Sequence, residues 1–92
     1  MPAFSLPAEL TLNTASAVRR QALAALSAQP GPWQVDASGL QTFDSSGLAL
    51  LLELRRAAPQ QTLHVRGVPQ RLHDLAKAYG LDFLFAQAAP QS

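Results

Sequence analysis

The residues best suited to chemistry form the tetrapeptide Asp44-Ser45-Ser46-Gly47, which opens a leucine-rich run. Aspartate and serine are preferred at helix N-caps, because a side-chain oxygen accepts a hydrogen bond from an otherwise unpaired amide of the first turn. We predict Asp44 as the cap, with Ser45 as the alternative. Two hydroxyl groups would then lie at the positive end of a helix dipole, on a loop that a partner or a kinase can reach.

The tetrapeptide has a simpler interpretation as an N-cap with no further role. A cap needs one acid or hydroxyl, however, and here three capping residues occur in a row. The following helix also has more leucine than one core face can use. These two features favour a recognition or phosphorylation site. A phosphate on Ser45 or Ser46 would be stabilised by the helix dipole and repelled by Asp44, and such opposed effects suit a switch.

Three other kinds of site are disfavoured by the sequence. The G-x-S-x-G motif of many hydrolases is absent, and we expect His64 on an exposed strand face and His73 on a helix surface. No H-x-x-x-H or H-E-x-x-H pair indicates a metal site. Gly39 and Gly47 lack the lysine and the glycine spacing of a nucleotide-binding loop. We therefore predict no catalytic residue, no metal and no cofactor.

The tetrapeptide must be positioned by the elements on either side of it. A buried strand is predicted over Trp33 to Asp36, followed by a turn-forming segment from Ala37 to Phe43 and a helix from about Ser46 to Ala57. Leu48 and Leu51 lie on one stripe of this helix, and Leu50 and Leu54 lie on another. One surface should be buried, and the remaining leucines are expected to meet a second layer or another protein.

The rest of the chain alternates between strand-like and helix-like segments. We expect a strand at Ala3–Leu6, and at Glu9–Leu12 either a second short strand or, as the preferred alternative, the approach to a helix. That helix should run from a cap at Asn13 or Thr14 to about Ala28, before a break at Gln29–Pro32. Later in the chain we expect a strand at Thr62–Arg66, a helix from Pro69 to about Tyr79 with Tyr79 on its inner stripe, a short strand or turn at Leu81–Phe85 and a frayed tail over residues 86–92. This alternation predicts one α/β domain over residues 1–92, with parallel strands and helices mainly on one face.

The composition limits the kinds of partner. The 92 residues are 48% hydrophobic and only 14% charged, so a covered face and hence a protein partner are expected. The net charge of +1 argues against nucleic acid or anionic lipid as the main ligand. No apolar run approaches the roughly 20 residues that span a bilayer, and the first residues lack the basic region of a signal peptide. We therefore expect a protein that does not insert into the membrane.

The segments VDASGL and FDSSGLALLL resemble the STAS family, the fold of anti-sigma factor antagonists and of regulatory modules on transporters. GVP before the third helix and LAKAYGL near the end extend the resemblance over nearly the whole chain. The runs Leu48–Leu52 and Leu75–Tyr79 are closer to the MlaB-like STAS subunit of Mla-type phospholipid ABC transporters. The resemblance implies a small mixed, mainly parallel sheet with helices packed mostly on one face. STAS domains usually begin with a two-stranded hairpin, whereas this chain has one convincing strand before its first helix.

The resemblance implies two alternative functions. An MlaB-like subunit is non-enzymatic and binds the transporter's ATPase, and through it the permease, on the cytoplasmic side of the inner membrane; the hydroxyl residue after the aspartate, here Ser45, lies in that contact. In anti-sigma factor antagonists the serine before the glycine, here Ser46, is phosphorylated. The isolated chain is also a candidate for self-association. The predicted partner-binding residues are Ser38, Thr42, Asp44, Ser45, Ser46, Gly47, Leu48 and Leu51.

Overall fold

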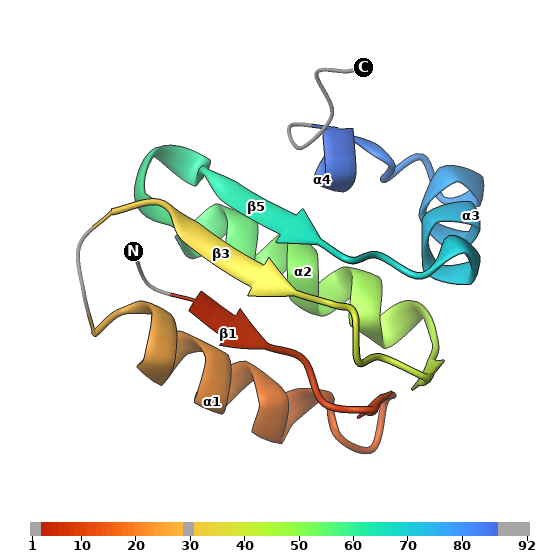
Figure 1. The fold of residues 1–92 in the computed structure, drawn as a ribbon, viewed down its shortest axis with the longest axis horizontal. Coiled ribbons are helices and arrows are strands. Elements are labelled where there is room, and N and C mark those ends of the chain that lie inside the picture. The colour runs from red at the N-terminus through yellow and green to blue at the C-terminus, as the bar shows by residue number, and fades with distance from the viewer. Residues whose placement is uncertain (1–2, 29–30, 87–92) are drawn as a thin grey trace.

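Three parallel strands form the central sheet of the computed structural model, which describes residues 3–28 and 31–86 (Figure 1). They are β1 (Ala3–Ser5), β3 (Trp33–Asp36) and β5 (Leu63–Arg66), in the spatial order β1-β3-β5. Val35 pairs with Phe4 on one side and with Val65 on the other, and both valines are buried. Gln34 and His64 pair one position earlier and are only half-buried. Because side chains alternate along a strand, one face of the sheet is apolar and needs a cover.

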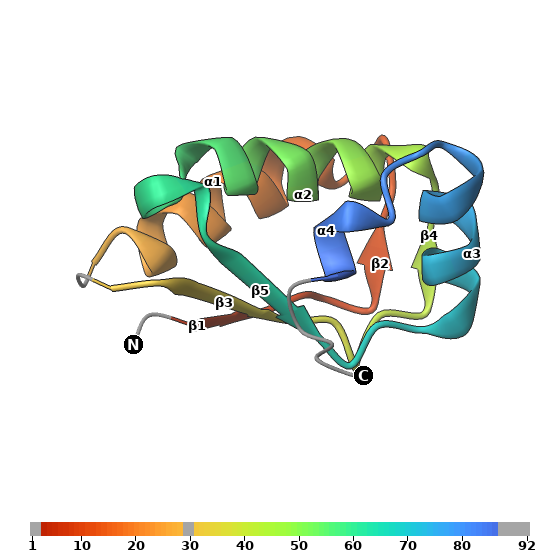
Figure 2. The ribbon, with the colours of Figure 1, turned by 90° about the horizontal axis from the view of Figure 1, so that it is seen from above.

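Helices supply that cover. Figure 2 shows α1 (Ala15–Leu26) and α2 (Ser45–Ala57) lying side by side over one face of the sheet. The short helix α4 (Phe83–Ala86) packs against β5 and α2, while α3 (Gln70–Ala78) stands at one end of the sheet (Figures 1 and 2). A 3-10 turn, η1 (Pro59–Gln61), links α2 to β5. The predicted α/β fold, with a small parallel sheet and helices mostly on one face, is confirmed.

A second ladder holds the start of α2 in place. Strands β2 (Glu9–Leu10) and β4 (Thr42–Phe43) pair in parallel, so the expected helix approach at Glu9–Leu12 is wrong, and the turn-forming segment ends in a strand. The N–H groups of Gln41 and Thr42 both donate to the carbonyl of Ala8 at 2.8 Å. These bonds join segments far apart in sequence. Two strands therefore precede α1, but β2 pairs with β4 and β1 pairs with β3.

The leucines of α2 belong to the core. Leu48, Leu50, Leu51 and Leu54 are each no more than 2% exposed, so of the two predicted alternatives they meet a second layer of the domain and not another protein. The reason is the position of α2, which lies over the sheet with α1 on one flank and α4 on the other. A helix covered on three sides buries more than one stripe. Leu48 and Leu51 are therefore not available as partner-binding residues.

Two further expectations near the C-terminus are wrong. The segment predicted as a strand or turn forms α4, whose Leu84 and Phe85 are buried in the core. Tyr79, expected on the inner stripe of the third helix, is 59% exposed, because α3 ends at Ala78 and Tyr79 is its C-cap residue, with φ −93° and ψ 0°. Residues 87–92 of the predicted tail, and Gln29 and Pro30 of the predicted break, lie outside the described residues.

Candidate functional site

Asp44 ties together the two loops that flank the start of α2. Its Oδ1 accepts a hydrogen bond from the N–H of Ser46 at 2.8 Å, which confirms Asp44 as the N-cap. Its Oδ2 accepts from the N–H of Leu12 at 3.1 Å. These donors, that of Leu12 first and that of Ser46 second, lower the pKa of Asp44 below its usual 3.8. The carboxylate thus fixes the β2–α1 connection against the first turn of α2.

Gly47 and the leucine after it position this turn from inside. Gly47 is buried, and a Cβ added to it would lie 3.3 Å from Cδ2 of Leu10 in β2. The absence of a side chain therefore lets α2 approach β2 closely. Gly47 and Leu48 are packing residues of the site, which corrects their prediction as contacts for a partner.

Ser45 lies exposed in a groove between the start of α2 and α3, which we call the Ser45 groove. Its volume is about 660 Å³. The groove is lined from two sides, by Phe43, Asp44 and Ser45 at the β4–α2 junction and by Arg71, Asp74, Leu75, Ala78 and Tyr79 on or beside α3. Figures 1 and 2 both place α3, β4 and the start of α2 at the same end of the molecule. An exposed hydroxyl beside apolar side chains is a geometry that a protein partner can recognise.

The other predicted hydroxyl residues lie apart from this groove. Ser46 is half-buried behind Ser45. Ser38 is exposed in the turn after β3, where its N–H donates to Oδ1 of Asp36 at 2.9 Å. Thr42 is exposed in β4, next to Phe43, and strand alternation directs its side chain away from the groove that Phe43 lines. The structure therefore brings Asp44 and Ser45 together and leaves Ser38 and Thr42 outside.

Sequence reasoning missed the wall of the groove that α3 supplies. Arg71, Leu75 and Ala78 recur at the three- to four-residue spacing of one helical stripe, so a stripe was visible in the sequence. Whether this stripe faces Ser45 depends on how α3 packs against the rest of the domain, and the sequence of α3 alone does not show that packing. Leu12 was also missed, although it is 78% exposed and its N–H donates to Asp44.

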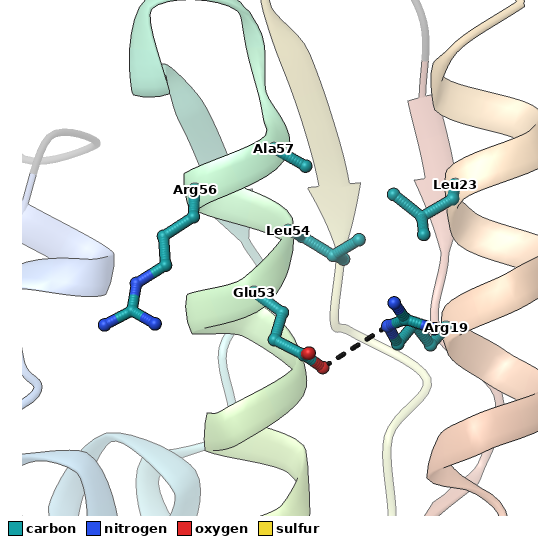
Figure 3. Close-up of a pocket in the computed structure, with 6 residues that line it drawn as sticks. All are labelled: Arg19, Leu23, Glu53, Leu54, Arg56 and Ala57. Atoms are coloured by element: carbon teal, nitrogen blue, oxygen red, sulfur yellow. Dashed lines mark ion pairs between the residues drawn. The ribbon is translucent and has the colours of Figure 1, made fainter.

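A second groove runs between α1 and α2, and we call it the Arg19 groove (Figure 3). It has a volume of about 330 Å³ and is lined by Arg19, Leu23, Glu53, Leu54, Arg56 and Ala57. Nε of Arg19 lies 3.5 Å from Oε1 of Glu53 across it. None of the predicted site residues lines this groove.

Two kinds of feature are absent from the described part of the chain. Within it, no three histidine, cysteine, aspartate or glutamate side chains are grouped so that they could hold a metal ion. No helix there combines the length and the apolar character that crossing a bilayer requires.

The model of a protein family described as "Mlab, STAS domain" matches residues 2–86. The match contains every strand and helix of the structure, and it includes the whole of the Ser45 groove. No curated protein matches the chain.

Proposed function

Because the chain belongs to the MlaB family of STAS domains, we propose that it is a non-enzymatic accessory subunit of an Mla-type phospholipid ABC transport system. It binds the ATPase subunit and stabilises or regulates it. Through that contact it lies at the permease, on the cytoplasmic side of the inner membrane, without inserting into the bilayer itself. The resemblance drawn from the sequence, to the STAS family in general and to MlaB in particular, is confirmed by the family match.

One observation supports this docking site above the others, namely the exposure of Ser45 in an apolar-walled groove. Ser45 follows the capping aspartate directly, which is the position where the MlaB-like resemblance places the contact with the ATPase. The side chains on either side of it in sequence are engaged, since Asp44 caps α2 and Ser46 is half-buried. Ser45 is therefore the hydroxyl that a partner reaches first.

Replacement of Ser45 tests the proposal. At an interface the Ser45 hydroxyl pairs with a polar group of the ATPase, and leaving that group unpaired costs roughly 1–3 kcal/mol of binding free energy. Ser45→Glu adds a charge to the same contact and should reduce co-purification with the Mla-type ATPase of the same organism strongly. Ala24→Glu, which adds the same charge to an exposed position of α1, is the control. Equal recovery of the ATPase with both variants would contradict the proposal.

A second function, an anti-sigma factor antagonist switched by phosphorylation, is favoured by a different observation. Ser46 is half-buried and not sealed in the core, so a kinase can reach it after a small opening of the turn. A phosphate there would gain from the α2 dipole and be repelled by Asp44. Incubation with a partner kinase, followed by mass spectrometry, separates the two functions. Stoichiometric phosphate on Ser46 supports the switch, and its absence together with ATPase binding supports the transport subunit.

A further inference from the structure

We propose that the Ser45 groove binds a segment of the ATPase that carries a carboxylate beside apolar side chains, and that Arg71 pairs with the carboxylate. This inference rests on the proposed function and adds the chemistry of the partner segment. It follows from the apolar side chains that line the groove and from the contacts that its charged side chains already make within the domain.

The walls of the groove account for the apolar part of the segment. Leu12, at 78% exposed, and Tyr79, at 59%, are two of the three large hydrophobic side chains that are exposed in the described residues. Tyr79 lines the groove, and the backbone of Leu12 is bonded to Asp44 at its edge. Phe43, Leu75, Ala78 and Tyr79 give the groove apolar side chains beside the Ser45 hydroxyl, a combination that marks an interaction surface.

Arg71 is held in place by an aromatic ring instead of an ion pair. Its Cζ lies 4.9 Å from the centroid of the Phe43 ring, in a cation–π contact. Within residues 3–28 and 31–86 it forms no ion pair with an acidic side chain. A guanidinium stacked on a ring keeps the N–H groups at its edge free to donate in its own plane, the geometry that pairs with both oxygens of a carboxylate.

Both carboxylates that line the groove accept hydrogen bonds from neighbouring groups. Asp44 accepts from two backbone N–H groups, and Oδ1 of Asp74 accepts from Nε2 of Gln70 at 2.9 Å. Asp74 still repels a second carboxylate, so the acidic group of the partner must lie at the Arg71 side of the groove. The hydroxyl of Ser45 adds a further donor in the same groove. Arg71 is the one cation among the residues that line the groove, so its guanidinium is the group there that a carboxylate of the partner satisfies.

Affinity measurements with charge variants test this assignment. The purified Mla-type ATPase of the same organism is titrated with wild type, Arg71→Gln, Arg71→Lys and Arg20→Gln, at about 50 and about 300 mM NaCl. Arg20 is an exposed arginine of α1, so Arg20→Gln makes the same charge change elsewhere. We expect Arg71→Gln to weaken binding at least about tenfold at low salt and to flatten the salt dependence. Arg71→Lys, which keeps the charge and loses the planar fork, should fall between, and Arg20→Gln should match wild type.

The outcomes separate this inference from the proposed function. If binding is lost with Ser45→Glu but Arg71→Gln behaves like Arg20→Gln, the carboxylate contact is wrong while the docking function stands. If wild type does not bind the ATPase at all, both fail. If the isolated chain dimerises in sedimentation runs and Arg71→Gln abolishes only the dimer, the groove belongs to a second copy and the inference is overturned. Melting curves of each variant confirm that the exposed substitutions leave the fold intact.

Discussion

The two grooves that border α2 use their charged side chains in opposite ways. In the Arg19 groove, Arg19 lies 3.5 Å from Glu53, so this cation and anion neutralise each other within the molecule, and Arg56 is a second arginine of the lining. In the Ser45 groove, Arg71 stacks on Phe43 and has no acidic partner among the described residues, while Asp44 and Asp74 accept hydrogen bonds from their neighbours. The Arg19 groove therefore contains an ion pair between its two walls, whereas the arginine that lines the Ser45 groove pairs with no carboxylate among the described residues.

The largest effect should come from the part of α2 that lies between the grooves. Leu51→Ala should lower the free energy of unfolding by about 2–5 kcal/mol, because Leu51 is fully buried and its loss leaves a cavity. Leu12→Ala removes the same atoms from a side chain that is 78% exposed. It should leave stability nearly unchanged and weaken ATPase binding. Urea unfolding followed by circular dichroism gives the first quantity. A Leu51→Ala variant of normal stability that fails to bind would place Leu51 on the surface after all.

The next largest loss of stability is expected at Gly67, which lies against the turn that carries Ser38. Gly67 has φ +69°, and a Cβ there would lie 2.7 Å from Cβ of Ser38, so Gly67→Ala should destabilise by about 1–3 kcal/mol. Gly80 has a similar φ of +73° but no atom within 4 Å of an added Cβ. Gly80→Ala therefore shows the backbone strain alone and should cost less. Because Ser38 lies outside the Ser45 groove, ATPase affinity of the folded Gly67→Ala protein should match wild type. Equal losses of stability in the two variants would contradict the close approach of Ser38.

Acidification should weaken the hydrogen bonds by which Asp44 connects the Leu12 loop to the first turn of α2. The folded pKa of Asp44 is lowered below 3.8, so its contribution to stability is complete above that pH and is lost as the pH falls through the folded value. Asp36 behaves in the same way, because the N–H of Ser38 holds its pKa low. Asp44→Asn keeps a good capping residue but removes the charge. Its melting temperature should therefore fall less steeply on acidification than that of wild type. Parallel curves for the two proteins would contradict this role.

The sequence revealed the elements whose signals are local. Alternating segments around Val35 and Val65 predicted the parallel sheet, and Asp44 was identified as the cap from its residue type and position. The strand β2 was missed because two residues have no period, and its existence depends on bonds between Ala8 and the distant Gln41 and Thr42. The helix α4 was missed for a similar reason. A segment of four residues is too short for the pattern of its buried residues, Leu84 and Phe85, to distinguish a helix from a strand.

The site was predictable on one side only. Asp44 and Ser45 were found from the sequence, because capping and hydroxyl chemistry are properties of single residues. The leucine count misled, since it assumes that a helix has one covered face, whereas α2 is covered by the sheet, α1 and α4. Arg71 could not be assigned to the groove, because the rotation of α3 about its axis is fixed by the packing of Leu72 and Ala76, and Tyr79 could not because it lies where the helix ends. The sequence indicates an exposed stripe on α3, but it does not show which part of the molecule that stripe faces.

The smallest effect is expected in the Arg19 groove. The side chains of Arg19 and Glu53 are 47% and 56% exposed, and exposed ion pairs contribute about 0–1 kcal/mol to stability. Glu53→Gln should therefore change the free energy of unfolding by less than about 1 kcal/mol, and the difference should vanish in high salt because screening removes the attraction. Its affinity for the ATPase should equal that of wild type, in contrast to Arg71→Gln. If Glu53→Gln weakened ATPase binding as much as Arg71→Gln does, both sides of α2 would contact the partner, and the distinction between an ion-paired groove and a docking groove would no longer hold.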